Sequence, residues 1–187
     1  MWFVPMKPQI ARRVKQPKLT IELVPGTAWF SNLRSILPKR DWDSLRRPVY
    51  RLAGYRCEVC RGRGKQHPVE AHEVWTYDDT SHVQRLVRLI ALCPACHEVK
   101  HIGLASVRGR RREATTHLKA VNDWSDRKAG AYVRKAFHDW TERTRHEWAV
   151  EIDWDELATR YGAQLTRKGR EKLSAGDRQK AKRRRQH

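Results

Sequence analysis

The chain has 187 residues, of which 39% are hydrophobic, enough for one domain with extensions or for two small domains. Lys and Arg number 40 against 21 Asp and Glu, so the formal net charge at pH 7 is +19. This excess excludes a protein that collects cations and favours a polyanionic partner, either nucleic acid or an anionic membrane surface. No run approaches the ~18 apolar residues of a membrane span, and the start lacks the basic segment of a signal peptide, so we expect a cytoplasmic chain.

The first segment, residues 1–50, is basic and is interrupted by six prolines, which limit regular structure. Within it, apolar and polar residues alternate over 19–24, which predicts a half-buried strand that ends at Pro25. Apolar residues then recur at helical spacing and predict two short helices, over 29–37 and 42–49.

The second segment, residues 51–105, contains all four cysteines and five of the nine histidines. We expect a strand over 67–75, a loop over 77–81 and an apolar stretch over 86–92 that enters the second cysteine pair. A short helix then begins at Cys93 and is expected to end at Gly103.

The third segment, residues 106–160, has a helical pattern. One helix is expected over 114–121, and a longer one follows Ser125, a good N-cap residue. We interpret the apolar stripe of the longer helix as packing onto the preceding module rather than as a base-stacking surface. The fourth segment, residues 161–187, reads as a basic, mobile tail.

The four cysteines form two Cys-x-x-Cys pairs, Cys57 with Cys60 and Cys93 with Cys96. A secreted disulfide scaffold would spread its cysteines through the chain, whereas paired thiolates two residues apart suit a tetrahedral soft metal ion. Because no cysteine is left over, the pattern predicts one structural zinc site.

The second cysteine pair runs directly into two histidines. His97 and His101 are four residues apart, so on a helix they share a face and can reach one point together. The 32 residues between the two pairs are enough for a β-hairpin, and His72 within it is the obvious third ligand of a second metal site. The alternative is that His97 and His101 are ordinary surface histidines.

The combination of Cys57-x2-Cys60, a strand with His72, and Leu92-Cys93-Pro-Ala-Cys96-His97-x3-His101 resembles the zinc-stabilised HNH endonucleases. The motif covers residues 52–104. The resemblance implies an α+β fold, in which a small four-cysteine ββα-metal finger is embedded in a mainly helical chain.

The resemblance also implies an endonuclease that hydrolyses phosphodiester bonds in DNA with one divalent ion (Mg²⁺, Mn²⁺, Ni²⁺ or Zn²⁺) beside the structural zinc. In that family a strand-end pair supplies a metal ligand followed by a general-base histidine, and the helix supplies the other ligands. Here the pair is matched by His72 as ligand and Glu73 as base, with His97 and His101 as the remaining ligands. In the alternative alignment His72 is the base and Ala71 occupies the ligand position. Arg88 stands where the family has an Asn.

Basic side chains are expected to contact phosphates without reading sequence, so the nuclease would nick DNA with weak specificity. The candidates are Arg88, Arg110, Arg111, Arg112, Arg183, Arg184 and Arg185. The sequence does not decide whether the substrate is DNA or RNA, or whether the protein acts as a homodimer or within a nucleoprotein complex. It also leaves open a nucleoid-associated or phage-encoded setting. The alternative function is a catalytically inactive zinc-finger protein that binds nucleic acid on the same scaffold.

Overall fold

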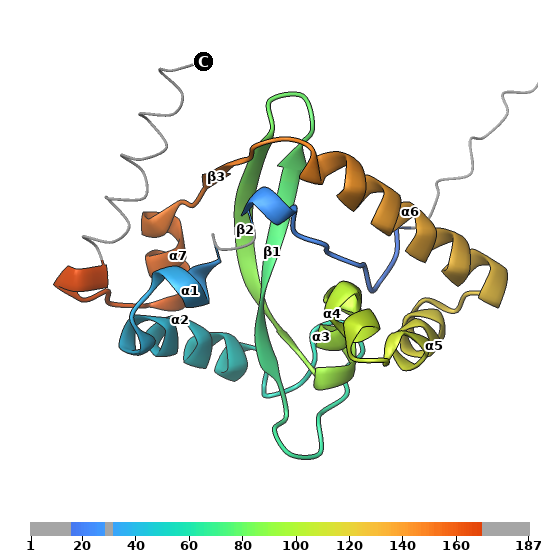
Figure 1. Cartoon of the computed structure of the whole chain (residues 1–187). Coiled ribbons are helices and arrows are strands. Elements are labelled where there is room, and N and C mark those ends of the chain that lie inside the picture. Colours follow the sequence, from blue (N-terminus) through green and yellow to red (C-terminus); the bar gives the residue numbers. More distant parts are fainter. Residues whose placement is uncertain (1–15, 29–31, 170–187) are drawn as a thin grey trace, which may run out of the picture.

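The computed structural model describes residues 16–28 and 32–169, which form a mixed α+β fold (Figure 1). The basic tail that the sequence predicts lies outside these residues from 170 onward, as do Arg183, Arg184 and Arg185. The elements in chain order are η1 (Gly26–Ala28), α1 (Leu33–Ile36), α2 (Lys39–Leu52), β1 (Glu70–Asp78), β2 (Val83–Leu92), α3 (Pro94–Lys100), α4 (Ile102–Val107), α5 (Arg111–Asn122), α6 (Asp126–Thr144), β3 (Ala149–Glu151) and α7 (Trp154–Tyr161).

A long antiparallel hairpin of β1 and β2 occupies the middle of the molecule (Figure 1). Its register pairs Glu70 with Leu92 at one end and Asp78 with Val83 at the other, and it shifts between Val74 and Trp75. The short β3 extends the sheet as a parallel neighbour of β2. Because successive side chains of a strand point to opposite faces, the hairpin separates two hydrophobic cores.

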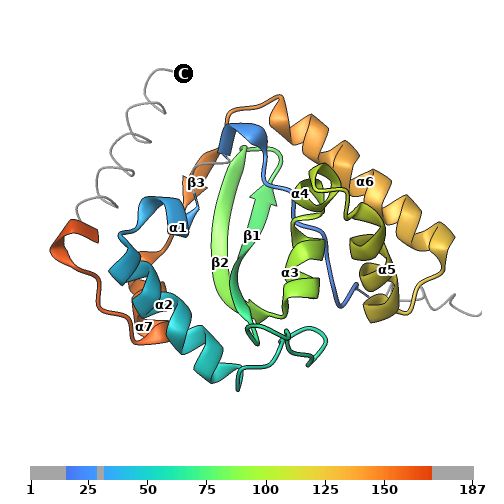
Figure 2. The ribbon, with the colours of Figure 1, turned by 60° about the horizontal axis from the view of Figure 1, so that its bottom comes forward.

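The first core lies between one face of the hairpin and helices α1, α2 and α7 (Figure 2). Trp75 and Leu89 reach it from the strands, and Leu45 and Val49 reach it from α2. Tyr161 at the end of α7 joins the core to the sheet, because its hydroxyl accepts from the backbone N–H of Leu89 and donates to the carbonyl of the same residue.

The second core lies on the opposite face, among α3, α4, α5, α6 and the segment around Leu19 and Ile21 (Figure 2). It contains the buried Cys57, Cys93 and Cys96. Side chains of α6, including Tyr132 and Phe137, pack against it, which confirms the interpretation of the α6 stripe as core packing.

Several predicted elements are confirmed, with shifted ends. The Ser125 side chain caps α6 by accepting from Lys128 N–H, as expected. The predicted strand over 19–24 is wrong, since this segment runs outside the sheet and its Glu22 N–H donates to the carbonyl of Lys100. The predicted stop at Gly103 is also wrong, because Gly103 lies inside α4. No helix among residues 16–28 and 32–169 is long and apolar enough to cross a membrane.

Asp41 connects α2 to the chain that follows α7. Its carboxylate is fully buried and accepts two hydrogen bonds from Thr166, one from the backbone N–H at 2.8 Å and one from the hydroxyl at 2.7 Å. Gly169 lies so close that a Cβ there would come within 2.3 Å of an Asp41 oxygen. This contact fixes the segment from Ala163 to Gly169 against α2.

We therefore expect Asp41→Ala to lower the free energy of unfolding by about 2 kcal/mol, because the two Thr166 donors lose their buried acceptor. Denaturant titration measures this change as a lower midpoint. The control is Asp43→Ala on the same helix, whose partner Lys39 is 88% exposed. Equal midpoints for the two variants would contradict the assignment.

Candidate metal centres

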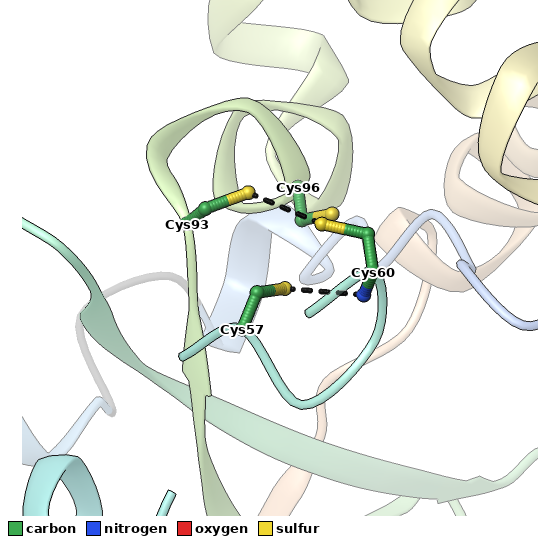
Figure 3. Close-up of side chains that lie close together, drawn as sticks. All are labelled: Cys57, Cys60, Cys93 and Cys96. Atoms are coloured by element: carbon green, nitrogen blue, oxygen red, sulfur yellow. Dashed lines mark hydrogen bonds between the residues drawn. The ribbon is translucent and has the colours of Figure 1, made fainter. Parts of the chain in front are cut away.

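The four cysteines converge between the loop before β1 and the start of α3 (Figure 3). Their sulfur atoms all lie within 4.8 Å of one another, and the Cys60 and Cys93 sulfurs are 3.6 Å apart. Tetrahedral zinc with Zn–S bonds of ~2.3 Å places sulfurs ~3.8 Å apart, so the donor set fits zinc. Cys93 is the N-cap residue of α3 and Pro94 begins that helix, which directs both sulfurs of this pair toward the loop.

Hydrogen bonds to sulfur support this cluster. The N–H of Cys60 donates to the Cys57 sulfur, the N–H of Gly62 donates to the Cys60 sulfur, and Nε2 of His117 lies 3.2 Å from the Cys96 sulfur. The hydrogen bond from Cys96 lowers the pKa of Cys57 to about 4, and burial raises the pKa of Cys93 to about 11. Burial therefore favours the neutral thiol of Cys93, and a cation bound by the four sulfurs would favour the thiolates instead.

Three histidines form a second cluster beside the first. His72 comes from β1, His97 lies within α3 and His101 follows the last residue of α3. One ring nitrogen from each lies within 4.8 Å of the others. The ring centroids are 4.7 to 5.3 Å apart. The spacing of four residues along α3 and the register of the hairpin thus bring together the three histidines that the sequence predicts.

The far side of His72 is held by a buried ion pair. Glu22 Oε2 lies 2.9 Å from His72 Nε2, and because a carboxylate only accepts, Nε2 carries the proton and Nδ1 keeps a free lone pair. The second oxygen of Glu22 accepts from the ammonium group of Lys100, which is 4% exposed. Burial alone would raise the pKa of Glu22, but His72 and Lys100 together lower it.

His97 is held in the same manner by Glu70. Its Nδ1 donates to Glu70 Oε2, which leaves Nε2 free, and His67 Nε2 donates to the other oxygen at 2.5 Å. The hydrogen bond from His97 lowers the pKa of Glu70 to about 2. Carboxylates that fix the ring nitrogen opposite a metal-binding nitrogen are a regular feature of histidine metal sites.

Burial keeps two of the histidines neutral. It lowers the pKa of His72, and burial with the neighbouring His72 and His97 lowers the pKa of His101 to about 3. A neutral imidazole has the lone pair that a metal ion requires. The three histidines therefore fit a divalent ion with at least one position open to another ligand.

The structure does not bring Glu73 to the three histidines. His72 and Glu73 are neighbours on a strand, so they point to opposite faces of the hairpin. The Glu73 carboxylate accepts from the N–H of Leu33 at 2.8 Å, at the start of α1, and burial raises its pKa to about 7. Glu73 thus connects β1 to α1 in the first core, away from its expected place as general base.

The predicted phosphate-binding arginines divide into two groups. Arg88 pairs with Glu58 and Arg110 pairs with Glu98, so acidic partners offset their charges. Arg111 lies over the ring of Phe137, and Arg112 is exposed.

Sequence reasoning missed the roles of Glu22, Lys100 and His117. Glu22 is 50 residues from His72 in the chain and lies in a segment that was expected to be an ordinary strand. The spacing contained a signal for Lys100, because it lies three residues after His97 on the same helix and therefore on nearly the same face. Nothing in the sequence near His117 connects it with the cysteines.

Comparison with known proteins does not assign the chain to a family: no family model, no curated protein and no solved structure matches it.

The four-cysteine cluster should hold one zinc ion on which the fold depends. Cys57→Ser or Cys96→Ser is expected to remove the zinc and the cooperative thermal transition of residues 52–104, because structural zinc contributes on the order of 10 kcal/mol in small modules. Zinc content and a thermal scan measure both effects. A cooperative, unchanged transition in the zinc-free protein would show that the metal is dispensable.

Glu22 should control ion affinity at the histidines. Glu22→Gln is expected to weaken Co²⁺ binding there by about 10- to 100-fold while the four-cysteine zinc stays bound, because His72 loses a charged acceptor. Titration calorimetry on protein that retains one zinc measures the affinity. Glu156→Gln, which changes an exposed pair with Arg160, is the matched control. Equal Co²⁺ affinities would remove Glu22 from the site.

Proposed function

We propose that the protein is a metal-dependent endonuclease of the HNH type that hydrolyses phosphodiester bonds in DNA. The observation that carries the proposal is the convergence of His72, His97 and His101 beside the four-cysteine cluster, on a hairpin followed by a helix. A divalent ion at the three histidines would supply a Lewis acid for a phosphodiester oxygen and make water more acidic.

The charges around the histidines suit an anionic substrate. Glu22 and Glu70 contribute two negative charges and Lys100 one positive charge, so the group is at −1 when the histidines are neutral. A dication brings the total to +1, which attracts a phosphodiester monoanion without making the ion's own binding unfavourable. The role of Glu22 and Glu70 is to orient the imidazoles, and Lys100 prevents an excess of buried negative charge.

The surface charge supports nucleic acid as the partner. The described residues alone contain 28 Lys and Arg against 19 Asp and Glu, and the remaining residues add a further excess of positive charge. Such a chain binds a polyanion mainly through phosphate contacts.

One observation favours a second function. Glu73 is buried against α1, so the position that the HNH resemblance gives to the general base does not face the three histidines. A protein with this arrangement and without another proton acceptor would bind nucleic acid and a second metal ion but cleave nothing. The alternative is therefore a non-catalytic zinc module that binds nucleic acid.

A plasmid-nicking assay with Mg²⁺, Mn²⁺, Ni²⁺, Co²⁺ or Zn²⁺, after removal of loosely bound metal, tests the proposal. His72→Ala should lower the nicking rate by at least about 100-fold, the scale of loss typical for an essential catalytic group, and should weaken ion binding. His138→Ala on the exposed side of α6 is the matched control and should nick normally.

Glu73→Gln separates the two roles of that residue. Because its carboxylate contacts Leu33 in the first core, we expect this variant to melt at a lower temperature but to nick at nearly the wild-type rate below that temperature. A large loss of nicking with unchanged stability would restore Glu73 as the base. Wild-type protein that binds DNA but nicks nothing with any of the five ions would favour the non-catalytic alternative.

A further inference from the structure

The loop that contains the first cysteine pair has a dense group of exposed cations. We call the group the basic knuckle; it extends from the last turn of α2 into the loop before β1, next to the start of α3 (Figure 2). Its members are all exposed: Arg51, Arg56, Arg61, Arg63 and Lys65.

The positive charge of the basic knuckle is not offset locally. Glu58 is the only acidic residue between positions 51 and 65, and its carboxylate accepts from Arg88 and from the N–H of Ala91. Two of the arginines are held by neutral carbonyl groups instead: Arg56 donates to the carbonyl of Arg61, and Arg63 donates to that of Gly54. Their guanidinium groups keep their full charge toward solvent.

The backbone of the knuckle is shaped by the metal-binding turn. Cys57 N–H donates to the carbonyl of Gly62, and Arg61 N–H donates to that of Cys57. Arg61 has a φ of 64°, which closes the turn, and its side chain is exposed. The cations are therefore held on a fixed turn, which lowers the entropy lost when they bind a polyanion.

The basic knuckle also adjoins the histidine cluster. Gly64 packs against Pro94 at the start of α3, and its N–H donates to the carbonyl of Pro68. From there His67 reaches Glu70, which holds His97. These contacts place the loop of the basic knuckle next to Glu70 and His97.

We propose that the basic knuckle is a docking surface for the phosphate backbone of nucleic acid, which it leads toward the histidine cluster without reading base sequence. The inference rests on the nucleic-acid partner of the proposed function, but it does not require cleavage. Arginine and lysine side chains that contact phosphates release condensed counterions, so each contact adds to the salt dependence of binding.

The test is a triple variant of the basic knuckle that combines Arg56→Gln, Arg61→Gln and Arg63→Gln. Its matched control changes three exposed positions of α6 and combines Arg127→Gln, Lys128→Gln and Arg134→Gln. Both lose three positive charges. Fluorescence anisotropy with a labelled duplex, without added divalent ion, gives log affinity against log salt from 50 to 200 mM. The knuckle variant should have a slope shallower by about 2 to 3, since each lost contact with duplex DNA removes ~0.9. The control should change the slope by less than 1.

Zinc content and thermal melting establish that each variant is folded. If the triple variant loses its zinc, Arg51→Gln with Lys65→Gln, which lies outside the cysteine turn, is expected to lower the slope by about 1 to 2. A slope equal to that of wild type, or equal losses for knuckle and control, would overturn the proposal. A protein that nicks nothing but has the predicted loss of slope would overturn the nuclease and leave the docking surface in place.

Discussion

Four sulfur atoms within 4.8 Å of one another are the constraint on which the other contacts of this molecule depend. They join the loop before β1 to the first turn of α3, segments that border opposite ends of the hairpin sequence. Buried thiols in such proximity resist joint ionisation, so a cation bound among them would stabilise the thiolates. A cation bound there would fix the start of α3, and with it the positions of His97 and His101 relative to His72.

Because of the pleat of β1, its alternate side chains face either the histidine cluster or the first core. His72 and Glu70 lie two residues apart and face α3, whereas Glu73 faces α1 and the first core. Any residue next to a metal ligand on a regular strand points away from the metal, so a ligand and a base can be consecutive only where the strand ends or distorts. Here β1 continues to Asp78, and its irregularity comes after Val74, too late to turn Glu73 around.

The sequence was sufficient for those parts of the site that depend on local spacing. The two Cys-x-x-Cys pairs predict a four-sulfur cluster, and the His-x3-His pattern predicts two histidines on one helix face. Ser125 likewise predicts the start of α6. The sequence was insufficient where long-range contacts decide. The three-residue β3 is an element only because β2 offers it an edge, and the segment around Glu22 alternates like a strand but lies against α3 instead. The position of Glu73 was missed because a resemblance transfers residue order, not the face on which a side chain lies.

The buried charges beside the histidines and the exposed charges of the basic knuckle differ in their range of action, because their surroundings differ. Glu22, Lys100 and Glu70 act at short range with little solvent between them, so their balance would set how strongly the proposed histidine site holds an ion. The exposed arginines of the basic knuckle are screened within ~10 Å at 0.1 M salt, so they would act on the proposed partner at contact and not on an ion at the histidines. Ion affinity and polyanion affinity can therefore vary independently, although Glu70 and His67 connect the two regions. If the basic knuckle binds nucleic acid as proposed, that binding would persist when the histidine cluster changes, so binding alone would not identify the chemistry.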